Sequence, residues 1–296
     1  MIRTLSFEIN EEHSGMDIRT FVRQELKLSA RVLTSLKYDG EILKNGKAAF
    51  SNEKLNAADV LTLRLYDEGG CYEAVPSDIR VLFENEDFLV IDKPAGMPVH
   101  PSPGHDNDSV LNCAAWYFRE HDDFTFRPLY RLDKDTTGAL VIAKNKFAAC
   151  AELQKTYMAV CEGAVPPSGI IDEPIGLLPG HSIQRCVGVG QRAITEYTLM
   201  RECSDYSLVE FNLLTGRTHQ IRAHMANIGH PIAGDDMYGG HTNRTAQQML
   251  CCKSVRIACP VLGAELFIET DFPKEQKQAF TELFGGSFDT GMDQSV

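Results

Sequence analysis

The chain has 296 residues, enough for two domains, and its hydrophobic share of 43% and charged share of 24% are ordinary for a globular protein. No apolar run is long enough to span a bilayer, and acidic residues interrupt the N-terminus before a signal-peptide pattern forms, so we expect a cytoplasmic protein without a membrane partner. The net charge of −12 disfavours a general nucleic-acid binder, but phosphate binding needs only local positive surface, and the first 66 residues are slightly basic.

The nine cysteines are irregularly spaced and include no Cys-x-x-Cys pair. A chain of this length needs no disulfide scaffold, and structural zinc requires four ligands at recognisable spacings. His219 and His224 are five residues apart, not the four of a helical metal pair. We therefore expect reduced, mostly buried thiols and no metal site.

The first 66 residues predict a small module of two helices and a β-sheet. Ser29 is a helix-capping residue type, and the apolar residues after it recur at helical spacing. Asn45-Gly46 lies between two short apolar runs and predicts a tight hairpin, because both turn positions favour positive φ. The expected elements are an edge strand at 3–10, a helix at 15–27, a second helix after Ser29, the hairpin, and a strand at 60–65.

Residues 67–79 predict a linker, punctuated by Gly69-Gly70 and Pro76, and residues 286–296 predict a flexible tail. Between them, residues 80–285 predict a second domain in which strands outnumber helices without a regular βαβ repeat. That order indicates an α+β fold with a mixed, mainly antiparallel central sheet and flanking helices. Strands are expected at 80–84, 88–92, 139–143, 156–162, 193–199, 206–214 and 255–257, and helices at 110–118, 146–154, 219–228 and 274–283.

A polar loop at 130–138 runs directly into the apolar strand expected at 139–143. A carboxylate in such a loop is held by a rigid scaffold and faces solvent, so Asp133 and Asp135 are both catalytic candidates. Capping of backbone N–H groups is the commoner role of an aspartate beside threonine and glycine. From the residues alone, the capping role is the favoured interpretation.

The sequence Arg-Leu-Asp-x-x-Thr-Thr-Gly around Asp133 resembles the catalytic motif of the RluA family of pseudouridine synthases, in its ribosomal large-subunit branch. Four further segments resemble family motifs in the expected order, at 93–101, 155–163, 215–224 and 231–239. Five ordered motifs over about 150 residues are far more specific than one short motif. Two residues depart from the family pattern: Tyr130 stands where histidine is usual, and Thr137 where serine is usual.

The first 66 residues resemble the S4 RNA-binding domain, whose helix pair presents basic side chains to structured RNA. The two resemblances together imply a central sheet of the pseudouridine synthase type preceded by a small S4-like αα-β domain. The domain boundaries expected from them are 1–66 for the S4-like domain, 67–79 for the linker, 80–285 for the catalytic domain and 286–296 for the tail.

The resemblance assigns catalysis to Asp133, places Tyr157 against the excised base, and makes Arg222 the cation that keeps the carboxylate ionised and aimed. The reaction needs no electron or group donor, so no cofactor is expected. The residues implied to contact RNA, or to hold the loop that does so, are Arg131, Thr136, Thr137, Gly138, Arg217, Thr218, His219 and Gln220, with Arg19, Arg23, Arg31 and Lys37 in the S4-like domain.

The predicted function is the isomerisation of specific uridines to pseudouridine in structured RNA by a monomer, with ribosomal RNA favoured over transfer RNA. One alternative is a non-catalytic RNA-binding or ribosome-assembly factor on the same scaffold. Another is a hydrolase that uses Asp133 and Asp135 as a carboxylate pair, although two residues of separation in a loop do not ensure the required spacing.

Overall fold

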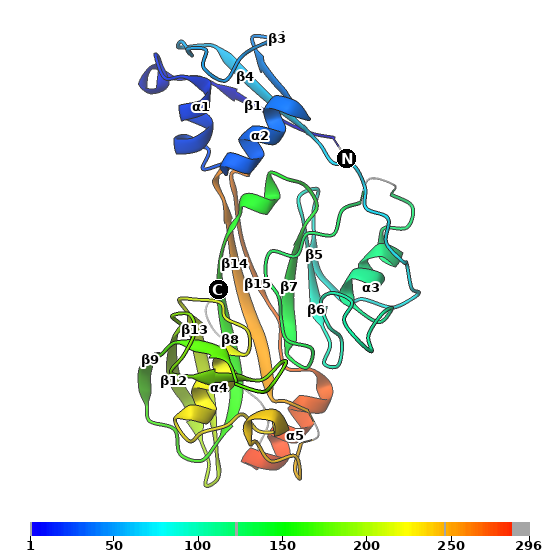
Figure 1. Cartoon of the computed structure of the whole chain (residues 1–296), viewed down its shortest axis with the longest axis vertical. Helices are drawn as coiled ribbons and strands as arrows, with labels where there is room; N and C mark the ends of the chain where they lie inside the picture. Colours follow the sequence, from blue (N-terminus) through cyan, green and yellow to red (C-terminus); the bar gives the residue numbers. More distant parts are fainter. Residues whose placement is uncertain (1, 122–123, 246, 286–296) are drawn as a thin grey trace.

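The computed structural model describes residues 2–121, 124–245 and 247–285, which form a small four-stranded sheet, a nine-stranded sheet and a two-stranded ribbon. The tail expected at 286–296 lies outside the described residues. The small sheet and helices α1 and α2 lie at one end of the molecule, and helices α4 and α5 lie at the other (Figure 1). No helix among the described residues is long and apolar enough to cross a membrane.

The small sheet has the order β1-β4-β2-β3, and every pair is antiparallel. The edge strand expected at 3–10 is confirmed, because β1 pairs only with β4. The predicted hairpin is confirmed as well: Asn45 has a φ of 51° and Gly46 a φ of 77°. The strands are β1 (Ile2–Glu8), β2 (Glu41–Lys44), β3 (Lys47–Ala48) and β4 (Val60–Tyr66).

Short helices cover one face of this sheet. The Ser29 hydroxyl accepts a hydrogen bond from the Val32 N–H at 3.3 Å and caps α2, as its residue type predicted. The apolar side chains of α2, those of Val32, Leu33 and Leu36, are buried. The helices are η1 (Glu11–His13), α1 (Ile18–Thr20), the π-helical turn η2 (Phe21–Glu25) and α2 (Ala30–Tyr38).

The large sheet has the order β5-β6-β7-β14-β8-β13-β12-β9, with β15 paired to β14. Its only parallel contact among the described strands is a two-residue pairing of β7 with β14, so the predicted mixed, mainly antiparallel α+β fold is confirmed. Its strands are β5 (Val81–Glu84), β6 (Phe88–Lys93), β7 (Thr137–Ala143), β8 (Glu152–Glu162), β9 (Ser168–Asp172), β12 (Ile194–Glu202), β13 (Tyr206–Leu213), β14 (Leu250–Cys259) and β15 (Ala264–Glu269). The separate ribbon is β10 (Ile175–Leu177) with β11 (Arg185–Val187).

Three of the four helices expected here are present. They are α3 (Val110–Tyr117), α4 (Gln220–Asn227) and α5 (Lys274–Phe284), with short helical turns η3 (Ala148–Cys150), η4 (Asp236–Tyr238) and η5 (Pro260–Leu262). The helix expected at 146–154 is wrong. Only the turn η3 forms there, and Glu152 already pairs with Ala258 at the start of β8. Long-range strand pairing overrides a local helical pattern in this segment.

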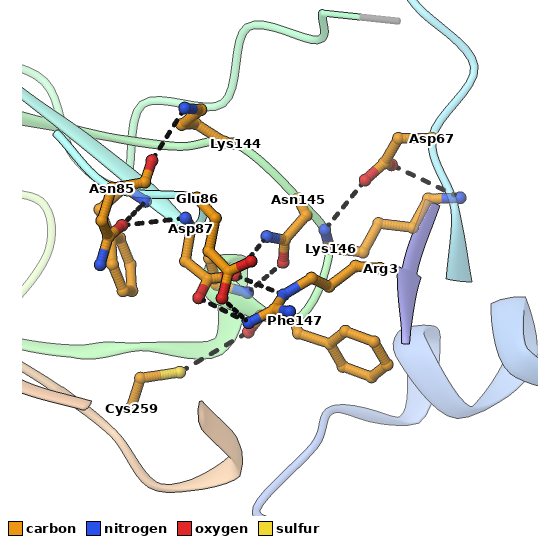
Figure 2. A network of polar contacts seen from close by, with 12 residues as sticks. Arg3, Asp67, Asn85, Glu86, Asp87, Lys144, Asn145, Lys146, Phe147 and Cys259 are labelled. Atoms are coloured by element: carbon orange, nitrogen blue, oxygen red, sulfur yellow. Dashed lines mark hydrogen bonds and ion pairs between the residues drawn. The ribbon is translucent and has the colours of Figure 1, made fainter. Parts of the chain in front are cut away.

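The N-terminal unit is fixed to one end of the large sheet by two groups of polar contacts. Figure 2 shows the group around Arg3 and Asp87, together with the contacts of Asp67 with Lys146. Arg3 donates to both carboxylate oxygens of Asp87, at 2.8 and 3.0 Å, and Asn145 donates to the same carboxylate at 2.7 Å. Asp67, which follows β4, accepts from Arg127 at 2.5 Å. Arg3 lies in the N-terminal unit and Asp67 directly follows it, whereas Asp87 and Arg127 lie in the part with the large sheet. The two groups therefore connect the two units at two points.

Apolar packing reinforces these ion pairs. One continuous buried cluster contains Leu61 and Leu63 of the small sheet together with Phe88, Val141 and Phe147 of the large sheet and its connections. The segment expected as a linker also has fixed partners. The Val75 N–H donates to Asn112 C=O at 3.2 Å, and the Asn112 side chain donates to Glu73 C=O at 2.9 Å. The N-terminal unit is therefore packed against the rest of the chain rather than tethered to it.

This docking predicts a strong effect of Asp87→Ala. The substitution leaves the partly buried guanidinium of Arg3 and the buried amide of Asn145 without their carboxylate, and we expect a loss of about 3 kcal/mol in the free energy of unfolding. Urea denaturation would measure it. Glu86→Ala is the matched control, because Glu86 pairs with the same arginine at 2.7 Å with a side chain that is 67% exposed, and its loss should cost less than about 1 kcal/mol. Equal losses in the two variants would contradict a buried docking pair.

Candidate active site

Asp133 lies in the loop that leads into β7, and hydrogen bonds hold the backbone of this loop in place. The Thr136 N–H donates to the Asp133 C=O at 3.2 Å, and the Gln248 side chain donates to the Thr136 hydroxyl at 3.0 Å. The side chain of Leu132 is buried, whereas the side chain of Asp133 is 24% exposed. The loop is thus rigid while its carboxylate remains accessible.

Lys93 also holds this loop in place, through a hydrogen bond to the backbone of Lys134. Its ammonium group donates to three carbonyl oxygens, those of Pro94 and Met97 at 2.8 Å and that of Lys134 at 2.7 Å. The side chain is fully buried at the end of β6. Burial lowers the pKa of Lys93 to about 7, against the opposing influence of the Asp135 and Asp133 carboxylates. A lysine therefore joins the 93–97 segment to the loop that carries Asp133.

Arg222 reaches Asp133 from α4. Its Nη1 donates to Asp133 Oδ2 at 3.3 Å, while its Nε and Nη2 donate to the two oxygens of Asp235 at 2.7 and 2.8 Å. Burial disfavours the charged guanidinium, but the hydrogen bonds and charge of Asp235, with those of Asp133, outweigh burial and raise the pKa of Arg222. The ring of Tyr238 lies 4.9 Å from the guanidinium carbon and covers it. The arginine is a fixed cation between two carboxylates.

Tyr157 comes from β8, where Phe211 and Cys252 are its partners on the neighbouring strands. Its side chain is 6% exposed. Burial, followed by the neighbouring Cys252 and Asp133, raises the pKa of Tyr157 far above the ordinary value for a phenol. The ring is therefore a neutral, flat apolar surface at the Asp133 site.

The residues predicted to be catalytic line one pocket of about 50 Å³, which includes Asp133, Tyr157 and Arg222 together with Arg131, Arg217 and His219. Asp135 does not line it among the described residues. A larger hollow of about 230 Å³ is lined by Arg244, Thr245, Gln247 and residues of α5, and none of these pocket side chains lines it. We base the site on the smaller pocket, because the charged groups converge there.

The residues implied to contact RNA fall into two sets. Arg131 and Arg217 are exposed beside Asp133, Thr218 is partly exposed, and Thr136 lines the pocket. His219 is 8% exposed, and its Nε2 lies 3.9 Å from Asp133 Oδ2.

The second set is buried, although Gln220 also lines the pocket. Thr137 and Gly138 are buried at the start of β7, where the Thr137 hydroxyl donates to Leu250 C=O at 3.3 Å. Gln220 is 3% exposed, and its amide donates to Ile194 C=O and Thr195 Oγ1. The hydrogen bonds of Thr137 and Gln220 hold the starts of β7 and α4 in place, and contact of these three residues with RNA stays a prediction.

The four basic residues of the N-terminal unit lie far from this pocket. Helices α1 and α2 occupy the end of the molecule opposite α4 (Figure 1). All four side chains are exposed, and a guanidinium nitrogen of Arg23 donates to Leu28 C=O. They are Arg19, Arg23, Arg31 and Lys37.

Tyr130, which departs from the family pattern, connects the loop before β7 to the strand itself. Its hydroxyl donates to Ala139 C=O at 2.6 Å, and the ammonium of Lys155 lies 4.5 Å from its ring centre. Asp235 and Tyr238 have direct contacts with Arg222, and their roles were not predicted. The only signal for them in the sequence was their position within the 231–239 segment. Among the described residues, no group of three or more His, Cys, Asp or Glu side chains could hold a metal ion.

Comparison with known proteins adds a family to this geometry. Residues 87–227 match the model of a family described as RNA pseudouridylate synthase. The chain is 32% identical over 297 residues to "Uncharacterized RNA pseudouridine synthase YhcT" of Bacillus subtilis, covering 95% of this chain and 98% of that protein. It is 32% identical to "Ribosomal large subunit pseudouridine synthase D" of Pseudomonas aeruginosa, covering 83% and 76% of the two chains. The solved structure "Human RNA Pseudouridylate Synthase Domain Containing 1" aligns with a TM-score of 0.56 at 25% identity, over 67% of this chain and 86% of that one.

The lowered pKa of Lys93 predicts a pH-dependent contribution to stability. Between pH 7 and about 10, the unfolded chain binds a proton at this lysine that the folded chain has released, so the stability of the wild type rises with pH in that window. Lys93→Met removes this linkage. The stability difference between the wild type and the variant should widen by about 1 kcal/mol per pH unit between pH 7 and 9.

Urea denaturation at pH 6, 7, 8 and 9 would measure this difference. Lys134→Met is the matched control, because the exposed Lys134 side chain carries the same charge in the same loop. Parallel pH profiles of the wild type and Lys93→Met would mean that Lys93 keeps its proton when buried.

Proposed function

The chain belongs to the RNA pseudouridylate synthase family and is an isomerase that acts on RNA, and we propose that it converts specific uridines of structured ribosomal RNA to pseudouridine with Asp133 as the catalytic carboxylate. The observation that carries this proposal is the convergence of Asp133, Arg222 and Tyr157 on one pocket. These three residues come from the loop before β7, from α4 and from β8.

The reaction breaks the N1–C1′ bond of uridine, turns the base, and forms a C5–C1′ bond. The proton lost from C5 is balanced by the proton gained at N1, so the substrate and product are isomers. Positive character develops on the ribose when the N1–C1′ bond breaks. An ionised carboxylate beside the sugar can attack C1′, remove the 2′ proton or stabilise that charge, and all three routes require the ionised form of Asp133.

Arg222 supports that form. A carboxylate in a partly buried pocket tends to keep its proton, whereas a guanidinium at 3.3 Å favours the ionised state. Asp235 fixes the guanidinium, so the direction of the donated hydrogen bond is fixed as well. We assign Arg222 to the orientation and ionisation of Asp133.

Tyr157 fits a stacking role. Its raised pKa keeps the phenol neutral, and a neutral phenol is a poor base but a good flat surface for a nucleobase. The target uridine must leave its helical stack to reach the pocket, which costs a few kcal/mol. An aromatic surface beside Asp133 offsets part of that cost for the flipped base.

The preference for ribosomal RNA rests on the printed name of the Pseudomonas aeruginosa relative and on the exposed basic residues of the N-terminal unit. We assign residues 1–66 to an S4-like RNA-binding domain and residues 80–285 to the catalytic domain. Ribosomal RNA is a cytoplasmic substrate in a bacterium, so we place the enzyme in the cytoplasm, acting as a monomer.

Asp133→Asn should abolish pseudouridine formation without unfolding the protein, because the amide keeps the shape of the side chain and removes its charge. Carbodiimide-dependent reverse-transcription stops would map pseudouridine in total RNA from cells that carry the wild type, no protein, or the variant. Specific uridines should lose the mark in the knockout and in the variant alike.

Asp135→Asn is the control. It lies two residues away, carries the same charge, and should retain the marks. If no uridine changes in the knockout despite full coverage of ribosomal and transfer RNA, the catalytic proposal fails and a non-catalytic assembly role replaces it. Free uracil released from RNA would instead indicate hydrolysis.

The basic residues of the N-terminal unit predict an effect on binding. Replacing all four with alanine should reduce the slope of log affinity against log salt by about 3 and weaken RNA binding at least about tenfold, since each basic contact releases about one counterion. The turnover number at saturating RNA should be unchanged, because these residues lie at the end opposite α4. Filter binding and kinetics would measure both. The four residues are Arg19, Arg23, Arg31 and Lys37.

The matched control removes the same charge from exposed positions of the catalytic part: Arg80, Arg119, Arg256 and Lys274. Equal weakening in both quadruple variants would mean that general charge, not the N-terminal face, attracts RNA.

A further inference from the structure

A chain of three polar contacts ends at the reacting carboxylate. The backbone N–H of Arg185, on β11, donates to the Tyr238 hydroxyl at 2.8 Å. That hydroxyl lies 2.9 Å from Nδ1 of His219, whose Nε2 is directed toward Asp133 Oδ2 at 3.9 Å. Tyr238 and His219 also meet edge to face, with ring centres 5.7 Å apart. The imidazole is therefore held in one orientation before RNA arrives.

The contacts of Tyr238 favour one of the two imidazole nitrogens of His219 as the site of the proton. The Tyr238 oxygen already accepts the Arg185 N–H, and its own proton has one acceptor among the described residues, Nδ1 of His219. This arrangement favours Nδ1 as the acceptor of the Tyr238 proton, and in a neutral imidazole the ring proton is then on Nε2. Nε2–H is therefore a hydrogen-bond donor aimed at Asp133.

The surroundings of His219 favour its neutral form. Burial lowers the pKa of His219, and among the charged groups around it Asp133 and Asp235 raise that pKa while Arg222 and Arg185 lower it. A neutral donor adds a hydrogen bond to Asp133 without a second positive charge beside Arg222. Among the described residues that line the pocket, Asp133 is the only carboxylate.

Both donors address the same oxygen of Asp133. Arg222 Nη1 lies 3.3 Å and His219 Nε2 lies 3.9 Å from Oδ2, whereas no group among the described residues lies within hydrogen-bond distance of Oδ1. At 3.9 Å the imidazole is not yet hydrogen-bonded. Catalytic hydrogen bonds are commonly long in ligand-free enzymes and tighten in the substrate complex.

We propose that His219, oriented by Tyr238, is a positioning residue that donates Nε2–H to Oδ2 of Asp133 when RNA is bound, so that Arg222 and His219 together hold Oδ2 and present Oδ1 to the ribose. The inference rests on the proposed function, in which Asp133 is the catalytic carboxylate. It gives His219 a role in aiming the carboxylate, distinct from the RNA contact that its motif implied.

The backbone at His219 provides a sharp test. Its φ of 57° and ψ of 23° are left-handed, a conformation that asparagine tolerates better than glutamine. The amide nitrogen of glutamine, however, occupies the place of Nε2, whereas the asparagine amide reaches only the Nδ1 position. A purely structural role therefore predicts that His219→Asn is the better replacement, and a positioning role predicts His219→Gln.

Tritium release from uridine C5, on the RNA in which mapping finds the mark, would measure the turnover number of the full-length variants. We expect His219→Gln to retain activity within a few-fold of the wild type. His219→Asn should lose about tenfold or more at unchanged melting temperature, as removal of one charge-assisted hydrogen bond implies. Tyr238→Phe should lose a similar factor, because Nδ1 then no longer has a donor that fixes the proton on Nε2.

Each outcome separates the two proposals. If His219→Asn equals or exceeds His219→Gln, the positioning role is overturned while the Asp133 proposal stands. If Tyr238→Phe keeps full activity, the tyrosine does not set the tautomer and the relay is overturned. If Asp133→Asn itself keeps wild-type activity, the proposed function fails first, and the relay fails with it.

Discussion

A guanidinium as buried as that of Arg222 needs a carboxylate beside it, because an unpaired charge removed from water costs several kcal/mol. Asp235 meets this need with both of its oxygens, so the pair is neutral and rigid. One nitrogen of the fork then remains for Asp133. The three side chains become more exposed from the protein interior toward the solvent: 1% for Asp235, 8% for Arg222 and 24% for Asp133. Asp235 accepts from Nε and Nη2, so Arg222 donates to Asp133 through Nη1 alone, at Oδ2. The other oxygen of Asp133, Oδ1, receives no hydrogen bond from Arg222.

The backbone beneath this ion network has little freedom. Gly138 has a φ of 104°, and a Cβ at this position would lie 2.3 Å from the Cys252 carbonyl oxygen. Only glycine lets β7 approach β14 this closely at the point where the loop that carries Asp133 ends. The parallel pairing of β7 with β14 is confined to Cys251 and Cys252 and lies directly below the loop. Tyr157 pairs with Cys252 on the other side of β14, so the register of three strands sets the position of Asp133 relative to Tyr157.

The fixed N-terminal unit extends this rigidity along the molecule. Strands β14 and β15 run between the end that carries α4 and the end beneath α1 and α2 (Figure 1). Arg3, Asp87 and Asp67 fasten the unit there, and the buried cluster continues across the junction. A rigid connection lowers the entropy lost when two surfaces bind one RNA, since their separation is already set. In the proposed function, such a connection would restrict the enzyme to RNA whose contact points match that separation.

Local patterns in the sequence predicted most of the N-terminal unit because its signals are local. A serine cap and an Asn-Gly turn act within a few residues, and both are confirmed. The helix expected at 146–154 did not form, because β8 pairs with a segment about 100 residues away, at Ala258.

The prediction of the site was limited in the same way, because its residues meet only in the folded chain. The family motifs pointed to Asp133 and Arg222 separately, but they did not show how close the two side chains lie in the folded protein. Asp235 was visible only as one of two adjacent aspartates, and nothing local distinguishes it from Asp236. The distinction arises from burial: Asp235 is buried against Arg222, whereas Asp236 is exposed at the start of η4. Burial of a charge next to its partner is a property of the folded chain, so the residue that organises the site becomes identifiable only when α4 and the 231–239 segment are seen together.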